Sequence, residues 1–145
     1  MNGLLPPAPL RLRALAFAYD VLPLLGLWFL AGVIGLALTG GALDPHRFAH
    51  RILVQALAAI LCGGYFVVSW TRGGQTLGMR AWGLHAVDEQ GRRLRVLRAL
   101  LRFVWATLAW LPGALGVLFL YLDPEHLPLH DRLSRTRLLY VPRRG

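Results

Sequence analysis

Three long apolar blocks constrain the fold of this chain more than any other feature. They run over residues 14–38, 52–70 and 103–122, and each holds about 19 to 25 residues. A helix needs about 20 residues to cross the roughly 30 Å of hydrocarbon in a bilayer. With 56% hydrophobic and 16% charged residues, the 145-residue chain is also too apolar for an ordinary soluble domain. The sequence therefore predicts an all-α membrane protein, a single domain over 1–145, with three transmembrane helices.

A secretory signal peptide is the alternative for the first block, because Arg11 and Arg13 precede it and small residues close it. The apolar cores of signal peptides hold about 7 to 15 residues. This block is longer, and it contains the acidic residue Asp20. A transmembrane helix is therefore the preferred interpretation.

Asp20 is an ionisable group inside a predicted membrane helix. Placing such a group at the centre of the bilayer costs about 2.5 to 3.5 kcal/mol on the insertion scale, so it needs a partner or a function. Arg13 lies two helical turns earlier on the same face, about 10 Å away along the axis. The carboxylate either binds a cation or a proton, or it is a buried acid that fixes helix packing with Arg13, Arg98 or Arg102 as its partner. The sequence leaves both explanations open.

Most of the secondary structure predicted outside the apolar blocks lies in the polar segment 71–102. A short β-like strand is predicted at 82–87, followed by a turn at 88–91 and a basic amphipathic juxtamembrane segment. Helical spacing places several arginines of that segment on one stripe, which could bind anionic lipid headgroups or could only signal membrane orientation. The headgroup-binding candidates are Arg92, Arg93, Arg95, Arg98 and Arg102. A second β-like run is predicted in the C-terminal tail at 137–141.

The arginines of the 71–102 segment favour a cytoplasmic location for it. The N-terminus is then cytoplasmic too, and the expected location is the inner membrane of a bacterium. Three crossings would place the C-terminus on the opposite side, although that terminus is itself rich in arginine. A third block that bends back at Pro112 would remove the conflict, but each half would be too short to cross alone. The side of the C-terminus stays open at this point.

Composition and motifs argue against several function classes. The net charge of +9 flanks apolar segments, which indicates anionic lipids rather than nucleic acid as the partner. The pair His46 and His50 and the pair His126 and His130 each lack a third strong ligand, so no metal site is predicted. The glycine-rich segment 73–78 lacks the Gly-Lys-Ser/Thr ending of a phosphate loop. No nucleophile–base–acid motif is present, so the sequence predicts a protein that is not an enzyme and has no cofactor.

Three separated motifs resemble the RDD family of membrane proteins. They are RALAFAYD at 13–20, GGQTLGMR at 73–80 with GLHAVD at 83–88, and HDRLSRT at 130–136. The resemblance implies that Arg13 and Asp20 are the family's first-helix arginine and aspartate. It implies Asp131 as the second aspartate, with Asp123 as the alternative. Arg80 stands where the family usually has lysine.

Two function classes follow from these observations. In the first, which the resemblance favours, the protein is a small transporter or ion/proton exchanger that acts as an oligomer. Arg13, Asp20 and Asp131 are then the candidates for ion or proton coupling. In the second, it is a non-catalytic membrane adaptor or assembly factor whose embedded charges fix helix packing. Both classes imply a homo-oligomer or a membrane-protein partner.

Overall fold

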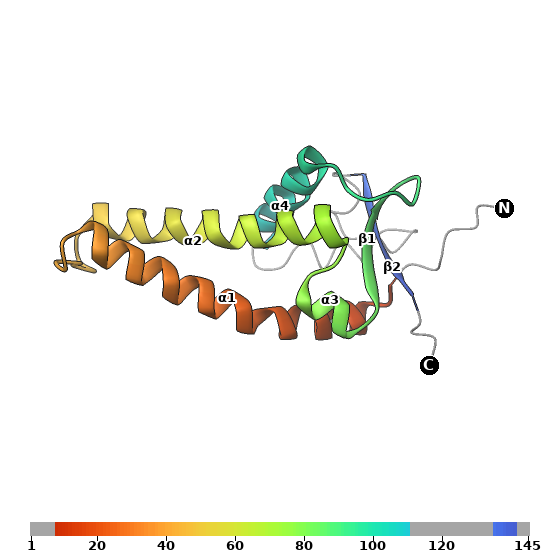
Figure 1. The fold of residues 1–145 in the computed structure, drawn as a ribbon, viewed down its shortest axis with the longest axis horizontal. Helices are drawn as coiled ribbons and strands as arrows, with labels where there is room; N and C mark the ends of the chain where they lie inside the picture. The colour runs from red at the N-terminus through yellow and green to blue at the C-terminus, as the bar shows by residue number, and fades with distance from the viewer. Residues whose placement is uncertain (1–7, 111–134, 142–145) are drawn as a thin grey trace.

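The structure, a computed structural model, describes residues 8–110 and 135–141. Its elements in chain order are the helices α1 (Leu10–Leu38) and α2 (Phe48–Val68), the π-helical turn η1 (Ser69–Gly73), the short helix α3 (Leu77–Ala81), the strand β1 (Leu84–Asp88), the helix α4 (Val96–Trp110) and the strand β2 (Thr136–Tyr140). Figure 1 shows α1 and α2 as a long antiparallel hairpin, with the remaining elements gathered at its open end. We call this end, residues 69–95 and 135–141, the head.

The hairpin has the properties of a membrane-embedded unit. Both α1 and the continuous helix Phe48–Gly73 are long and apolar enough to cross a bilayer, yet only 11% of the most apolar window of each is buried. A core helix of a soluble protein would be mostly buried. Large side chains such as Phe29 and Leu22 are 76% and 72% exposed on α1. Surfaces of this kind are stable against lipid and not against water.

Small residues set the spacing of the two helices. Ala31 and Gly35 of α1 are buried, and a Cβ added at Gly35 would lie 2.9 Å from a methyl carbon of Val54 on α2. On α2 the buried small residues are Ala58 and Gly63. Close contacts between helices in membranes generally use such residues.

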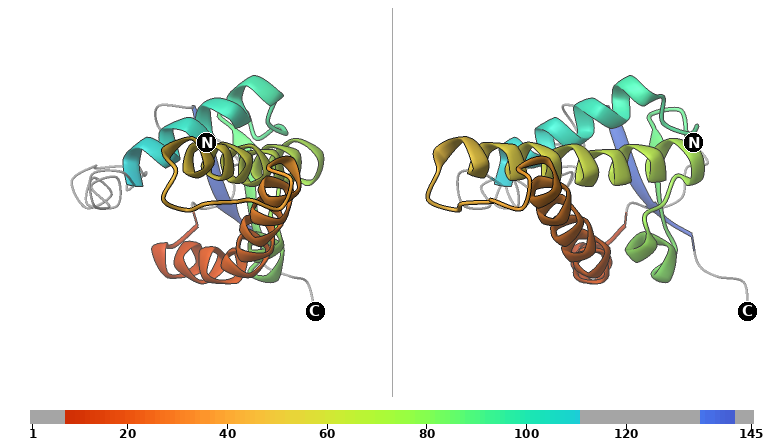
Figure 2. Two further views of the ribbon diagram at one scale, coloured as in Figure 1. Left: turned by 90° about the vertical axis from the view of Figure 1, so that its left-hand side faces the viewer. Right: turned by 60° about the vertical axis from the view of Figure 1, so that its left-hand side comes forward.

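The helix α4 packs on α2, on the side away from α1 (Figure 2). A Cβ added at Gly63 would lie 3.0 Å from the ring of Phe103, so this glycine allows the contact. The sequence predicted a boundary between a basic segment that ends at Arg102 and an apolar span that begins at Phe103. In the structure, the single helix α4 contains residues of both segments. With 15 residues, α4 is shorter than α1 and α2.

The two predicted β-like pieces are confirmed as strands, and they pair with each other. Leu84 lies opposite Tyr140 and Asp88 opposite Thr136 in an antiparallel register. Outside the pair, the backbone N–H of Ala8 donates to the carbonyl of Leu138 at 2.8 Å, so the start of the described chain lies against β2. The core beneath the sheet joins all parts of the head with α1 and α4; it includes Ala16, Trp70, Met79, Leu84, Ala86, Leu94, Ala99 and Leu138.

The third predicted span, 103–122, is described only as far as residue 110, and the strands on either side of it, β1 and β2, are paired. A third single crossing between β1 and β2 would place the two strands on opposite sides of the bilayer, where they could not pair. They are hydrogen-bonded neighbours, so the chain has returned to the head side by Thr136. The segment before α1, residues 69–95 and β2 all lie at one end of the hairpin (Figure 1).

This arrangement predicts the labelling pattern of single cysteines in sealed membranes. In a Cys62→Ser background, Arg11→Cys and Val141→Cys should react with an impermeant maleimide from one side. Ala42→Cys, in the connector between α1 and α2, should react only from the other side. Reaction of Arg11→Cys and Val141→Cys from opposite sides would contradict the fold.

Candidate functional site

The buried acid Asp20 is the centre of a hydrogen-bond cluster that joins α1, α2 and α3. Its side chain is 3% exposed. Oδ1 accepts from the hydroxyl of Tyr65 at 2.8 Å and from the backbone N–H of Gly78 at 2.9 Å, and Oδ2 accepts from the hydroxyl of Thr76 at 2.5 Å. Three donors from two other elements therefore converge on one carboxyl group. We call Asp20, Tyr65, Thr76 and Gly78 the Asp20 cluster.

The cluster also satisfies the first turn of α3. The first N–H groups of a helix have no partner within the helix. Here the N–H of Leu77 donates to the hydroxyl of Tyr65 at 3.1 Å, that of Gly78 to Asp20, and that of Met79 to the hydroxyl of Thr76 at 3.2 Å. Thr76 is thus an ordinary N-cap residue. The N–H of Gly78 is satisfied instead by the side chain of Asp20 on α1, so this hydrogen bond connects α3 to α1.

Gly78 is required by the closeness of this contact. A Cβ added there would lie 1.9 Å from the carbonyl oxygen of Ala16 and 2.8 Å from its carbonyl carbon. Both atoms belong to the backbone of α1 and cannot move aside alone. Only glycine lets α3 approach far enough for its amide to reach Asp20.

The loop before α3 is held by a second set of bonds. Gly74 ends η1 with a φ of 68°, a left-handed conformation that favours glycine. Its carbonyl accepts from the N–H of Ala86, and the side-chain amide of Gln75 donates to the carbonyl of Leu84 at 2.8 Å. The segment 73–78 is therefore a structural connection between α2, α3 and β1.

The expected arginine partners of Asp20 are wrong. Within residues 8–110 and 135–141, the contacts of Asp20 come from Tyr65, Thr76 and Gly78, and not from an arginine. The Nε of Arg13 instead donates to the carbonyl of Ala8 at 2.9 Å, which ties the chain before α1 to its first turns. Asp123 and Asp131, the two candidates for the second aspartate, lie outside the described residues.

The arginines of the predicted basic stripe differ in their exposure. Arg92, Arg93 and Arg95 are exposed, as a headgroup-binding surface requires. Arg102 is only 4% exposed: its guanidinium lies 5.0 Å from the ring centroid of Trp70 and donates to the hydroxyl of Thr136 at 2.5 Å. Arg102, one of the headgroup-binding candidates from the sequence, is therefore buried in the structure, because helical spacing alone does not show which face of α4 meets the core.

Arg98 also has a structural contact. Its Nη1 lies 3.3 Å from Oδ2 of Asp88, and the Nε of Arg92 lies 3.5 Å from the same oxygen. Burial alone would raise the pKa of Asp88. The backbone N–H groups of Arg92 and Gln90, with the charges of Arg92 and Arg98, outweigh it and hold that pKa below its ordinary value. Asp88 therefore stabilises the turn between β1 and α4 as a carboxylate.

His85 on β1 gives the head a pH dependence of the same sense as that of Asp88, but in the range where histidine titrates. Burial lowers the pKa of His85, so the folded state takes up a proton less readily than the unfolded state. Its contribution is neutral above the ordinary histidine pKa and becomes destabilising as the pH falls through it. We expect the thermal stability of the solubilised protein to fall between about pH 7 and about pH 5, and His85→Gln to reduce that fall. An unchanged pH profile in the variant would contradict this assignment.

Chemically, the Asp20 cluster is closed. Both carboxyl oxygens already accept hydrogen bonds, and the group is buried. Among the described residues there is no cluster of three side chains suited to holding a metal ion. The sequence identified Asp20 but not Tyr65, Thr76 or Gly78. The segment TLG at 76–78 could have indicated Thr76 and Gly78, because a threonine followed closely by a glycine is a possible helix N-cap with a close backbone contact.

An apolar helical hairpin joined to a basic head through a buried carboxylate defines a helical membrane protein with a fixed head. The family model described as "RDD family" matches residues 7–135. This chain belongs to the RDD family, and the resemblance in its three motifs is confirmed. No curated protein and no solved structure matches it.

Proposed function

We propose that this protein is a non-catalytic membrane adaptor: the apolar hairpin anchors it, and the Asp20 cluster holds the head in one orientation at the bilayer surface. The observation that supports this most is the closed geometry of Asp20. A coupling acid must exchange its cation or proton with water during a cycle. Asp20 instead directs both oxygens at donors from Tyr65, Thr76 and Gly78.

The energetics favour the same role. Each hydrogen bond to a charged group contributes about 1.5 to 3 kcal/mol, and losing its acceptor leaves a buried donor unsatisfied. Binding an ion at Asp20 would require breaking several such bonds and moving α3 away from α1. The cluster therefore favours a stable joint over a site that opens in each transport cycle.

The orientation follows from charge. The head carries seven of the 16 arginines, whereas the connector between α1 and α2 carries only Arg47, with Arg51 at the start of α2. Positively charged segments are retained in the cytoplasm. We propose that the head and the N-terminus face the cytoplasm in the inner membrane, where the exposed arginines meet anionic lipids.

One experiment separates the adaptor from the ion or proton exchanger. Purified wild type and Asp20→Asn are placed in proteoliposomes, and cation- and pH-gradient flux is measured beside detergent-solubilised size and thermal stability. The adaptor predicts no flux above empty liposomes and a variant with lower stability. Flux in wild type that is lost in an equally stable, equally assembled variant would contradict it and establish Asp20 as a coupling acid.

A further inference from the structure

The connector between α1 and α2, residues 39–47, is held in a defined shape by hydrogen bonds at both of its ends. At the end of α1, the N–H of Gly41 donates to the carbonyl of Leu36 at 2.9 Å. Towards α2, the N–H of Asp44 donates to Nδ1 of His50 at 3.0 Å. The side chains that the connector carries are therefore placed before any ligand arrives.

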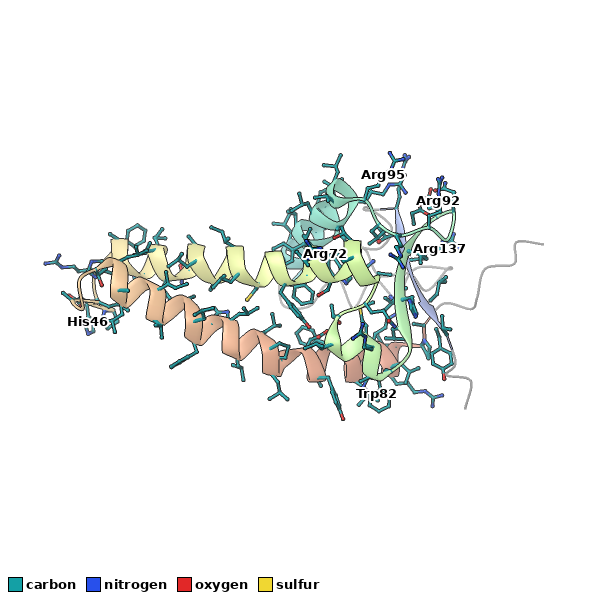
Figure 3. All side chains as sticks on the ribbon, viewed as in Figure 1. His46, Arg72, Trp82, Arg92, Arg95 and Arg137 are labelled. Carbon is teal, nitrogen blue, oxygen red and sulfur yellow. The ribbon has the colours of Figure 1, made fainter. Side chains whose placement is uncertain are left out.

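An open cavity of about 540 Å³ lies at this connector. It is lined by Leu38, Thr39, Ala42, Asp44, Arg47 and His50. Its volume lies within the range of about 300 to 1,000 Å³ that is typical of ligand sites. Figure 3 shows the connector, marked by His46, at the end of the hairpin away from the head. Because the two helices are long enough to cross a bilayer, this end of the hairpin lies at the depth of lipid headgroups.

Two opposite charges line the cavity without forming a tight ion pair. Nε of Arg47 lies 3.8 Å from Oδ2 of Asp44, which is too far for a hydrogen bond. The side chains of Arg47 and Asp44 are 72% and 45% exposed. Exposed ion pairs contribute only about 0 to 1 kcal/mol, so a ligand can replace this contact at little cost.

The remaining polar groups complete a site for two charges of opposite sign. Since Nδ1 of His50 accepts from the N–H of Asp44, the neutral imidazole carries its proton on Nε2 and can donate it. The guanidinium of Arg47 and this imidazole N–H suit phosphate oxygens. On Asp44, Oδ1 accepts from the N–H of His46 at 2.8 Å, whereas Oδ2 has no hydrogen bond to another described residue. That oxygen suits an ammonium group.

The rim of the cavity continues into the lipid-facing surface of the hairpin. Leu38 lines the cavity and is 65% exposed, and Phe48, next to Arg47 in the chain, is 70% exposed. Exposed side chains of this kind favour contact with acyl chains over contact with water. A molecule whose polar end enters the cavity can therefore lay its apolar part along the helices, which favours a lipid over a soluble ligand.

We propose that the connector cavity binds the zwitterionic headgroup of an aminophospholipid, with the phosphate at Arg47 and His50 and the primary ammonium at Asp44. The proposal requires that the hairpin crosses the bilayer, and it does not depend on whether the protein is an adaptor or an exchanger. It concerns the opposite end of the hairpin from the exposed arginines of the head.

The test uses the full-length protein in neutral detergent. Binding of phosphatidylethanolamine, phosphatidylcholine and phosphatidylglycerol with identical acyl chains is compared by native mass spectrometry. The variants are Asp44→Asn and Arg47→Gln. Their matched controls are Glu89→Gln, an exposed carboxylate of the head, and Arg51→Gln, an exposed arginine close to the cavity that does not line it. Thermal stability is recorded for every sample; asparagine keeps an oxygen that can accept from the N–H of residue 46, so the connector should keep its shape.

Wild type should bind phosphatidylethanolamine in preference to both other lipids, because phosphatidylglycerol has no cation and the methylated amine of phosphatidylcholine has no N–H to donate. Asp44→Asn should lower the binding of phosphatidylethanolamine relative to phosphatidylglycerol by about fivefold, and Arg47→Gln should weaken the binding of all three lipids. Each control should change these values by less than about twofold.

Three results would overturn the proposal: no preference for phosphatidylethanolamine in wild type, equal binding of phosphatidylethanolamine and phosphatidylcholine, or equal losses in the variants and their controls. Soluble O-phosphoethanolamine at the same concentration as the lipid should not displace it. Displacement would identify a soluble ligand and contradict the assignment to a lipid. None of these results changes the reading of the flux experiment on Asp20.

Discussion

Gly78→Ala is expected to separate α3 from α1 and to be among the most damaging single substitutions in the described chain. The added methyl group would lie 1.9 Å from the carbonyl oxygen of Ala16, inside any allowed contact distance. Since that oxygen is part of the α1 backbone, the clash is relieved only if α3 moves outward. The move would also break the bond between the Gly78 amide and Asp20. We expect a loss of about 3 kcal/mol or more of unfolding free energy.

The measurement is thermal or denaturant unfolding of the protein in detergent, with Gly73→Ala as the matched control. Gly73 lies five residues earlier, and a Cβ there meets nothing within 4 Å. The control should change the unfolding free energy by less than about 1 kcal/mol. A Gly78→Ala protein as stable as the control would show that α3 does not pack on α1 as described.

Asp20→Ala is expected to have an effect of similar size through lost hydrogen bonds. The substitution removes the acceptor of three donors, those of Tyr65, Thr76 and Gly78, and the last two lie in a buried site. Each buried donor left without an acceptor costs about 1 to 3 kcal/mol. Asp20→Asn should cost less, because its carbonyl oxygen still accepts from Tyr65 and Gly78.

A double-mutant cycle tests whether the loss arises in the cluster. Tyr65→Phe removes one donor, so its cost should be much smaller in the Asp20→Ala background than in wild type. Asp44→Ala provides the control, since Asp44 is a carboxylate in the connector at the other end of the hairpin. Additive effects of Asp20→Ala and Tyr65→Phe would contradict a shared cluster.

The long helices could be predicted from the sequence because hydrocarbon length is a direct physical requirement on the chain. The two β-like pieces could also be predicted, since each is a short apolar run bounded by polar residues. Their pairing could not, because it joins residues about 50 positions apart and depends on a return of the chain that composition does not encode.

The site shows the same division. Asp20 was recognisable because an acid in an apolar helix is costly, which predicts a partner without naming it. Charge complementarity pointed to arginine, whereas the partners are a tyrosine, a threonine and a backbone amide. Donors of this kind are common everywhere in a sequence and acquire meaning only when the fold places them together. The burial of Arg102 could not be predicted for a related reason, since it depends on contacts with Trp70 and Thr136.

Hydrogen exchange at the first turn of α3 tests the central claim, that Asp20 is the acceptor that joins the head to α1. The amides of Leu77, Gly78 and Met79 donate to side chains of the Asp20 cluster rather than to helix carbonyls. In wild type they should exchange slowly. In Asp20→Ala they should exchange much faster while the middle of α2 keeps its protection; unchanged exchange at Gly78 would contradict the account.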